Sequence, residues 1–578
     1  MNNGRIWVCD DEPSERFPVF TRGNVGEVFV EAVTPLTWSA FGRQSWEPAW
    51  RDAFCGIGAF SPEEFKPAGQ PEITACFGGY VYINMSVTRV LAVRIPGMTV
   101  EAIDRSLFGD YPDVPPYRPD PRDENPERTT AVSQWLQSLF VDDPRPVNAD
   151  NLRRLEAFLA DTVPMDTQTD QELVARFRSY LPEARHLFRQ HVLNGYGANV
   201  LASVIAQICE AVGAKDLAAA VTAGLGDVES AQPSFELWTL SRLVRASASL
   251  SLEFDRGVEG LLERLQQSND PDARRFLDTW NQFLDRWGFL GISVWDLRSP
   301  TYRDHPEIAL RMLERTRTVP DDAAPERRSG ELVRMREAAI ADVSARLAGN
   351  PQVQGQFVGA ARACARYLAA REAGKTHCTR LNDEARRVMR ALGTRMTGRG
   401  HLPRWGHVLL LNDDELDAFV AEPTVFATAL AERATRLAVL EGLEPPFVFE
   451  GSPPPLAVFR DRNGQASGVA AAGRELHGIG VSAGCHTGRA RIVRSLEADI
   501  DLEPGEVIVA PITDASWGPL FLAAGAVVVE TGAAISHAAI VSRELGIPAV
   551  VSVTGATSRI PDGSMVTVDG GAGVVTLL

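Results

Sequence analysis

Helical periodicity runs through the middle of the chain, from Thr130 to about Glu441, and defines its largest part. Leucine and alanine recur at three- and four-residue spacings in segments such as LRRLEAFLADTV and FELWTLSRLVRASASLSLEF. This spacing puts apolar side chains on one face of an α-helix. No fixed period relates one segment to the next, so the pattern predicts a large helical domain and excludes a repeat array.

The sequence on either side of this part has a different character. The first 130 residues are rich in proline, glycine and aromatic residues, and runs such as CFGGYVYINMSV predict a few strands and irregular loops. Residues 451–478 have the composition of a linker, dominated by proline, glycine, alanine and serine. After them, short β-like runs such as GEVIVAP and IPAVVSV alternate with the helical stretch SHAAIVSRELG, which predicts a compact α/β unit.

The chain has 578 residues, which is too long for a single hydrophobic core. We therefore predict a multidomain α+β fold, with a large mainly helical domain followed by a small α/β domain. The predicted parts are residues 1–450 (mixed strand and loop over 1–130, mainly helical over 130–450), a linker over 451–478, and the α/β domain over 479–578.

Charge and composition argue against several classes of protein. The net charge is −17 without a basic cluster, and such a surface repels nucleic acid. The N-terminus has no apolar segment of a secretory signal, and no stretch approaches the ~20 apolar residues of a membrane span. The seven cysteines are scattered and form no CxxC pair, which favours reduced thiols in a cytoplasmic protein. His377 and Cys378 are adjacent but lack further ligands, so we expect no metal site.

One histidine stands at a position where phosphate chemistry is favoured. The strand-like run VVVETG is followed by Gly532 and Ala533, which allow a tight turn, and Ser536 can then cap a helix that begins at His537. A helix start has unpaired N–H groups and the positive end of the helix dipole. A phosphoryl group accepted by a neutral imidazole would lie where its charge is stabilised. An ordinary helix-start histidine is the alternative.

The C-terminal sequence resembles the phosphohistidine swivelling domain of the phosphoenolpyruvate-utilising enzymes. The segments GIGVSAGCHTGRARIV, LEPGEVIVAPITDASWGPLFLAAGAVVVETG and AAISHAAIVSRELGIPAVV carry the resemblance. Ile535 stands where the synthases of the family have Thr or Ser, and an apolar residue there is similar to the rifampicin phosphotransferase branch. The resemblance implies that His537 carries the phosphoryl group in a dikinase-like reaction.

Segments farther upstream resemble the substrate-binding domain of the same branch. They are RGNVGEVFVEAVTPLTWSAFG, HVLLLNDDELDAF and AREAGKTHCTRLNDEARRVMRALGTRM, the last similar to its R-E-x-x-K helix. Arg371 and Lys375 lie four apart and share a helix face. The resemblance implies that both cations lie near the transferred phosphate. The alternative is a solvated helix face that includes Glu372.

The chain departs from this family at one polar run, G-H-R-G-x-x-E-x-D-L, which here reads GFLGISVWDL. Phe289, Leu290 and Val294 replace its His, Arg and Glu, and Asp296 remains. We predict that these four residues line a substrate chamber that suits an apolar ligand. Two alternatives stay open: the phosphotransfer chemistry has decayed, or the segment is a repacked part of the core.

The sequence also lacks the motifs of a nucleotide-binding site. The family's ATP-grasp domain would precede the TPLTW segment, which begins near residue 34, and no Gly-rich phosphate loop with a following lysine is present. We therefore expect no cofactor bound by this chain, with ATP and Mg supplied through a separate ATP-grasp partner. Ordinary structural roles are expected for five other histidines, His186, His191, His401, His407 and His486.

Three functions remain in competition. The leading one is a phosphotransferase-like subunit that moves a phosphoryl group from His537 to the hydroxyl of a small organic molecule, an alcohol, enol or phenol of secondary metabolism. The second is a nucleotide-independent cyclase, dehydratase or condensing enzyme with His537 as general acid or base. The third is a binding or regulatory protein whose docking is controlled by phosphorylation of His537.

Overall fold

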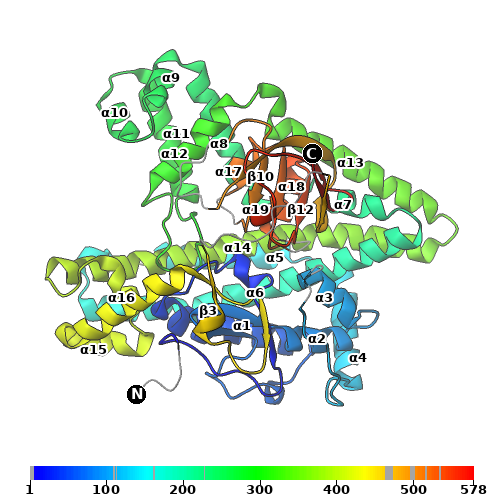
Figure 1. Ribbon diagram of the computed structural model, residues 1–578, viewed down its shortest axis with the longest axis horizontal. Helices are drawn as coiled ribbons and strands as arrows, with labels where there is room; N and C mark the ends of the chain where they lie inside the picture. Colours follow the sequence, from blue (N-terminus) through cyan, green and yellow to red (C-terminus); the bar gives the residue numbers. More distant parts are fainter. Residues whose placement is uncertain are drawn as a thin grey trace. The chain divides into compact units, whose positions relative to one another are not determined.

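The computed structural model describes residues 6–108, 111, 113–160, 163–226, 228–462, 473–494, 502–513, 517–532 and 536–578 (Figure 1). The chain forms two compact units. Unit 1 comprises residues 1–198, 295–299 and 366–465, and unit 2 comprises residues 199–294, 300–365 and 466–578. Two long helices, α6 (Asp170–Ala211) and α14 (Pro351–Gly398), contribute residues to both units.

A small antiparallel sheet lies in unit 1. Its order is β2-β3-β1-β5, with strands Thr74–Phe77 (β2), Tyr80–Asn84 (β3), Val19–Thr21 (β1) and Val448–Glu450 (β5). Phe20 packs against Phe77 and Phe449, with ring centroids 4.9 and 5.5 Å apart. β1 and β5 pair although more than four hundred residues separate them, so both ends of this unit's sequence share one sheet.

Helices make up most of unit 1. They are α1 (Glu47–Gly56), α2 (Met85–Arg94), α3 (Val100–Phe108), α4 (Pro126–Val141), α5 (Arg145–Ala160), α15 (Leu416–Ala421), α16 (Ala427–Glu441) and parts of α6 and α14. Residues Thr37–Trp46 form a π-helix, η2, a rare geometry that often marks functional sites. A Cβ atom at Gly42 would lie 2.3 Å from the Trp38 ring, so only glycine fits this turn.

Helix α6 is long and apolar enough to cross a membrane by length and composition. The mean hydropathy of its most apolar 18-residue window is 1.3, and 44% of that window is buried inside the protein. A core helix of a soluble protein passes the same test, so this is weak evidence for a membrane span.

Unit 2 contains a group of helices and the C-terminal α/β part. The helices are α7 (Ala218–Val221), α8 (Gln232–Ala246), α9 (Ala248–Asp255), α10 (Leu261–Gln267), α11 (Pro271–Trp287), α12 (Pro306–Thr318) and α13 (Pro325–Arg346). Asp270 caps α11 by accepting a hydrogen bond from the Asp272 N–H at 2.9 Å. The buried side chains of α11 follow helical spacing: Ala273, Phe276, Trp280, Phe283 and Trp287.

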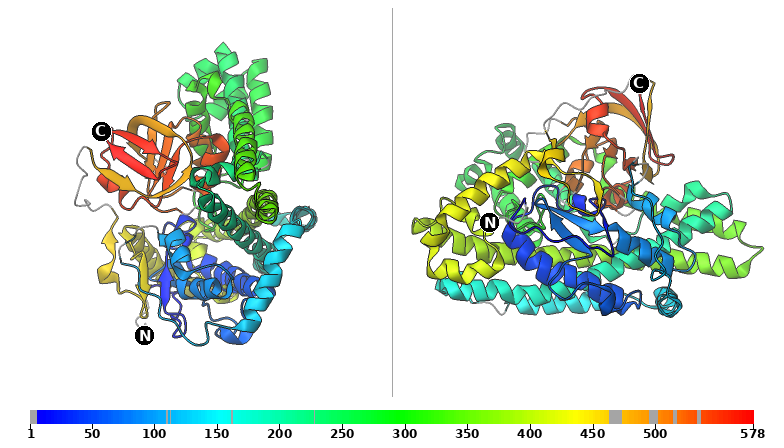
Figure 2. Two further views of the ribbon diagram at one scale, coloured as in Figure 1. Left: turned by 90° about the vertical axis from the view of Figure 1, so that its right-hand side faces the viewer. Right: turned by 60° about the horizontal axis from the view of Figure 1, so that its bottom comes forward.

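The C-terminal part, orange to red in Figure 2, contains a sheet. The sheet has eight strands in the order β7-β14-β13-β9-β10-β11-β12-β8. Its strands are Glu475–His477 (β7), Ile479–Ser482 (β8), Cys485–Ile492 (β9), Val507–Ala510 (β10), Ala526–Val529 (β11), Ala549–Val551 (β12), Met565–Asp569 (β13) and Val574–Leu577 (β14). Strands β9 to β12 are parallel, and α17 (Gly518–Phe521) and α18 (His537–Leu545) connect β10, β11 and β12.

Both faces of this parallel core are buried. Val507 and Val509 join one hydrophobic cluster, and the alternate residues Ile508 and Ala510 join another. A parallel strand that is buried on both faces has an apolar residue at nearly every position, as the sequence GEVIVAP has.

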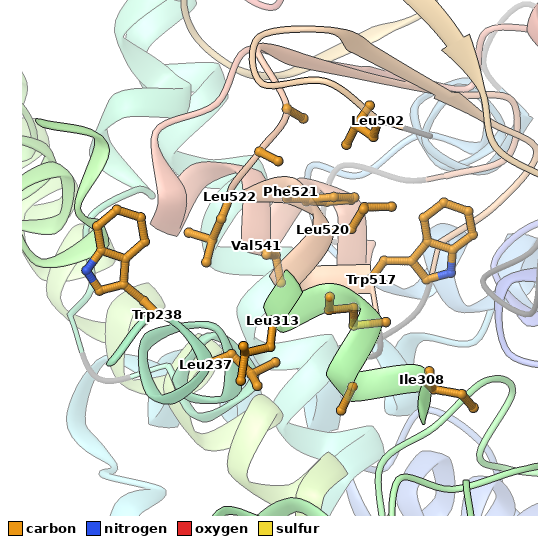
Figure 3. Packing of buried hydrophobic residues seen from close by; sticks show 14 of the residues in the cluster. Leu237, Trp238, Ile308, Leu313, Leu502, Trp517, Leu520, Phe521, Leu522 and Val541 are labelled. Atoms are coloured by element: carbon orange, nitrogen blue, oxygen red, sulfur yellow. The ribbon is translucent and has the colours of Figure 1, made fainter. Parts of the chain in front are cut away.

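The second of these clusters also contains side chains of helices α8 and α12. Leu237 of α8 and Leu313 of α12 belong to the same buried cluster as Leu520, Phe521 and Val541 of the C-terminal part (Figure 3). The helical residues 199–294 and 300–365 therefore fall in one compact unit with the α/β part. The predicted domain boundaries at residues 450 and 478 stay a prediction. The predicted fold class, a multidomain α+β protein with a small C-terminal α/β part, is confirmed.

Candidate functional site

The first element of the candidate site is the start of α18. The helix begins at His537, and the Ser536 hydroxyl accepts a hydrogen bond from the Ala539 N–H at 3.3 Å. Gly546, with φ of +65°, ends the helix in the left-handed conformation that favours glycine. His537 therefore lies in the first turn of a nine-residue helix capped at both ends.

Gly532, which follows β11, lies close to β12. A Cβ atom at Gly532 would lie 2.7 Å from the Val551 Cβ, so only glycine fits here. The Gly532 carbonyl also accepts a hydrogen bond from the Ser552 hydroxyl. Ala533, the other predicted turn residue, lies outside the described residues. The close approach of Gly532 to β12 is the constraint that the sequence pattern did not reveal.

His537 is buried in this arrangement, with 5% of its surface exposed. Its ring lies 6.4 Å from the Phe521 ring, at an interplanar angle of 45°. Every residue of α18 is buried. A bulky reactant therefore cannot reach His537 while α18 stays covered.

Two charged residues at the end of α18 fix it within unit 2. The Glu544 carboxylate accepts hydrogen bonds from the Leu225 N–H (3.1 Å to each oxygen) and the Gly226 N–H (3.2 Å). Arg543 Nε donates to the Val481 carbonyl at 2.5 Å. Burial raises the pKa of Glu544 and lowers the pKa of Arg543 to about 10. The Glu544 bonds join α18 to the loop residues that follow α7, and we call them the Glu544 contact.

The second element of the candidate site lies in the part of α14 that belongs to unit 1. Arg371 Nη1 donates to the carboxylate of Glu372, whose side chain is buried. The Lys375 carbonyl accepts from the Thr379 hydroxyl at 3.1 Å. Polar side chains stay buried at helical spacing along this segment: Glu372, Thr376, Thr379, Asp383 and Arg386. A buried polar row does not fit a solvated helix face.

His191 of α6 lies against this segment. Its Nδ1 atom is 3.2 Å from the Arg371 carbonyl oxygen, and a Cβ atom at Gly374 would lie 3.5 Å from the His191 Cα. From the sequence we expected only an ordinary structural role for His191. The contact joins residues 180 positions apart, and no local pattern reports it.

The four predicted chamber residues lie in two places. Phe289 and Leu290 belong to the hydrophobic cluster of unit 2, and Val294 is buried as well. The Asp296 carboxylate, in unit 1, accepts hydrogen bonds from Thr34 N (2.9 Å), Thr34 Oγ1 (2.8 Å), Thr37 Oγ1 (2.9 Å) and Arg298 N (3.1 Å). Their role in substrate binding stays a prediction, and this packing favours the alternative of a repacked core.

Unit 2 also has a groove of about 490 Å³ between the start of α13 and the C-terminal part. Its lining includes Arg328, Leu332, Met335, His486 and Ile547, and His537 is not among the lining residues. No group of three or more His, Cys, Asp or Glu side chains that could hold a metal ion occurs among the described residues.

Two family profiles match the chain. The profile of the rifampicin phosphotransferase fourth domain covers residues 187–372, which include His191 and Arg371. The profile of the PEP-utilising enzyme mobile domain covers residues 502–573, which include His537.

Curated relatives extend the similarity over most of the chain. An uncharacterised protein of Mycobacterium tuberculosis (strain ATCC 25618 / H37Rv) is 28% identical over 97% of this chain and 61% of its own length. A rifampicin phosphotransferase of Streptomyces sp is 29% identical over 64% of this chain and 42% of its own. The prodigiosin synthesizing transferase PigC of Serratia marcescens is 27% identical over 74% of this chain and 47% of its own.

The chain spans about three fifths or less of the length of these relatives. The two profile matches place a PEP-utilising mobile domain after a region of the rifampicin phosphotransferase type. Over these two regions the chain is similar to the PEP-utilising enzymes and, among them, to the rifampicin phosphotransferases.

Proposed function

We propose that the chain works in phosphoryl transfer, with His537 as the carrier. A ring nitrogen of His537 forms a bond to phosphorus, and the phosphoryl group later passes to the hydroxyl oxygen of a small organic molecule. The observation that carries this proposal is the position of His537 in the first turn of a Ser536-capped helix, inside a region matched by the mobile-domain profile.

The start of α18 suits a phosphorylated histidine for an electrostatic reason. The first N–H groups of a helix have no partner within the helix, and the helix dipole adds a partial positive charge. Ser536 binds the Ala539 N–H, and the dipole remains to stabilise added negative charge. This supports His537 as a carrier over a histidine that serves only packing.

The donor in this proposal is ATP held with Mg by a separate ATP-grasp protein. This part of the proposal rests on the sequence, which has no Gly-rich phosphate loop with a following lysine. Arg371 and Lys375 then offset the charge of the phosphoryl group during its transfer to the acceptor. We place the protein in the cytoplasm, acting on a small molecule and neither on nucleic acid nor at a membrane.

Movement of the mobile domain is part of the proposed cycle. His537 is 5% exposed under the surface that covers α18, so loading it requires that the C-terminal part leave the helices of unit 2. The composition of residues 451–478 suits such movement. Domain motions that gate an enzyme cycle occur in microseconds to milliseconds.

A biosynthetic role in secondary metabolism fits one relative, the prodigiosin synthesizing transferase of Serratia marcescens. The rival proposal of a nucleotide-independent enzyme rested on three polar residues replaced by Phe289, Leu290 and Val294. All three are packed in buried positions, which gives the replacement a structural explanation and leaves the rival without a specific observation.

The proposal is tested by labelling. Wild-type protein and His537→Ala are incubated with ATP labelled at the β-phosphate, alone and with extract of the source organism. We expect acid-labile, base-stable label on the wild type only, and only with extract. Label on His537→Ala would contradict the carrier role, and label without extract would contradict the separate donor protein.

A further inference from the structure

The groove in unit 2 has two walls, and one of them is a single face of α13. Arg328, Glu331, Leu332 and Met335 line it at the three- and four-residue spacing of one helix face. The other wall belongs to the C-terminal part and includes residues 522–525 and 546–547. The volume of about 490 Å³ falls within the range of small-molecule sites, about 300–1,000 Å³. The groove is therefore large enough for a molecule of the size of a dipeptide.

The wall formed by the C-terminal part offers mainly apolar contact. Its side chains are those of Leu522, two alanines and Ile547. The backbone N–H groups of residues 522–525 and 547 all donate to carbonyl oxygens of the same part of the chain, at 2.8–3.3 Å. His486 also lines the groove, and its Nε2 lies 2.8 Å from the Gly505 carbonyl oxygen, so this nitrogen donates. A ligand would therefore find apolar surface here.

The α13 wall carries a cation that has no bonded partner. Arg328 is half-buried, and among the described residues none forms a hydrogen bond or an ion pair with its guanidinium group. Burial lowers the pKa of Arg328, and attraction to the carboxylates of Asp322 and Glu331 offsets this only in part. A guanidinium group can bind a carboxylate through two parallel hydrogen bonds. Arg328 is therefore placed to bind a carboxylate in the groove.

The other charges of the groove decide what kind of carboxylate fits. Apart from His486, the ionisable residues of its lining are Arg328, Asp322 and Glu331. The two carboxylates are exposed, and they would repel a molecule that carries only negative charge. A molecule that carries only positive charge would be repelled by Arg328. A molecule with both charges is attracted at each end, so the three side chains favour a zwitterion.

We propose that this groove binds an apolar zwitterion of the size of a dipeptide. Its carboxylate pairs with Arg328, and its ammonium group lies beside Asp322 and Glu331. Its apolar body packs between Leu332 and Met335 of α13 and the apolar wall of the C-terminal part. Binding of this kind does not depend on phosphoryl transfer.

The position of the groove gives the ligand an effect on His537. Only when the C-terminal part is docked can the ligand contact both walls, so it binds the docked form better and shifts the population toward it. The open population falls by the factor 1 + [L]/Kd, which is about 11-fold at ten times the Kd. The ligand therefore holds His537 covered. This effect rests on the domain movement of the proposed function.

The first test measures binding to full-length protein by calorimetry and by NMR of ¹³C-labelled methionine methyl groups. The probe is leucyl-leucine. N-acetyl-leucyl-leucine lacks the positive charge, leucyl-leucinamide lacks the negative charge, and glycylglycine lacks the apolar body. The Met335 signal, assigned with Met335→Leu, reports on the groove. Met565 of β13, 43% exposed and outside the groove lining, is the matched control.

We expect leucyl-leucine to bind more tightly than the three comparison probes and to shift the signal of Met335 but not that of Met565. Arg328→Gln should weaken binding about 10- to 100-fold, since hydrogen bonds to a charged group are lost. Arg327→Gln, on the same helix but outside the groove lining, should not weaken it. Absence of binding, equal binding of N-acetyl-leucyl-leucine, or equal affinities of Arg328→Gln and wild type would overturn the inference.

The second test follows the carbethoxylation of His537 by diethyl pyrocarbonate at pH 6. The rate at His537 is divided by the rate at His407 of unit 1, which corrects for reagent consumed by the amine of the probe. At ten times its Kd, leucyl-leucine should lower this ratio about tenfold in wild type. Glycylglycine at the same concentration, or leucyl-leucine with Arg328→Gln, should lower it far less. An unchanged ratio while the Met335 signal shows a filled groove would overturn the effect on His537.

The two tests separate this inference from the proposed function. If His537 takes up no label from ATP under any condition, the proposed function fails, and the binding of leucyl-leucine is measured independently of that result. If His537 is labelled but leucyl-leucine does not bind, only the inference about the groove fails.

Discussion

The Glu544 contact controls, in our account, whether His537 can be reached. The Glu544 side chain is 4% exposed and binds two backbone N–H groups, those of Leu225 and Gly226. Replacing Glu544 with alanine leaves both N–H groups without their acceptor while the C-terminal part remains docked. When the C-terminal part lifts away, water can bind these groups, so the mutation favours the open form.

The size of the effect follows from the cost of an unsatisfied buried donor, about 1–3 kcal/mol for each group. Two such groups, partly relieved by local rearrangement, give about 2–4 kcal/mol. Because 1.4 kcal/mol is a tenfold change in an equilibrium constant, the open population should rise about 30- to 1000-fold. Glu544→Gln keeps one accepting oxygen and should give a smaller increase.

The assay is the rate of carbethoxylation of His537 by diethyl pyrocarbonate, followed by mass spectrometry of the peptide that contains it. If opening precedes modification, the rate is proportional to the open population. Glu475→Ala is the matched control, since its carboxylate lies on β7 in the same part of the chain and its side chain is 57% exposed. A His537 rate in Glu544→Ala that equals that of Glu475→Ala would refute the reasoning.

Three further predictions concern stability. Burial raises the pKa of Asp10 to about 6 from 3.8, so the stability linked to its protonation is complete below pH 3.8 and is lost as the pH rises through 6. In urea unfolding, the free energy of unfolding of Asp10→Asn should therefore gain about 3 kcal/mol on that of the wild type between pH 4 and pH 7. Identical dependence of the two free energies on pH would contradict this prediction. Ser536→Ala removes the cap of α18 and should cost about 1 kcal/mol in the same assay; no loss would show that the cap is dispensable. Leu313→Ala should cost about 2–5 kcal/mol because Leu313 is fully buried in the cluster shared by α12 and the C-terminal part, whereas Leu252→Ala, at a side chain 66% exposed, should change stability by less than about 0.5 kcal/mol.

The sequence predicted those features that local patterns encode. The apolar runs of β10 and β11 are the buried parallel strands of the C-terminal sheet, and Ser536 caps the helix at His537. Alternation, caps and turn residues act over a few positions, so a single sequence reveals them.

The sequence could not predict contacts between distant segments. His191 meets the Arg371 carbonyl across 180 positions, and Glu544 meets Leu225 across 319. Phe289 and Leu290 are predicted chamber residues by their place in a motif, and no local pattern reveals that they also belong to the hydrophobic cluster of unit 2. Such contacts depend on how helices pack in three dimensions, which periodicity does not specify.

The most direct test of the account is to locate the phosphoryl group on the chain. Wild-type protein is incubated with ATP and extract of the source organism, digested under alkaline conditions that preserve phosphohistidine, and mapped by mass spectrometry. The account predicts one modified histidine, His537, with His186, His191 and His486 unmodified. An unmodified His537 in a sample where another residue carries the phosphoryl group would contradict it.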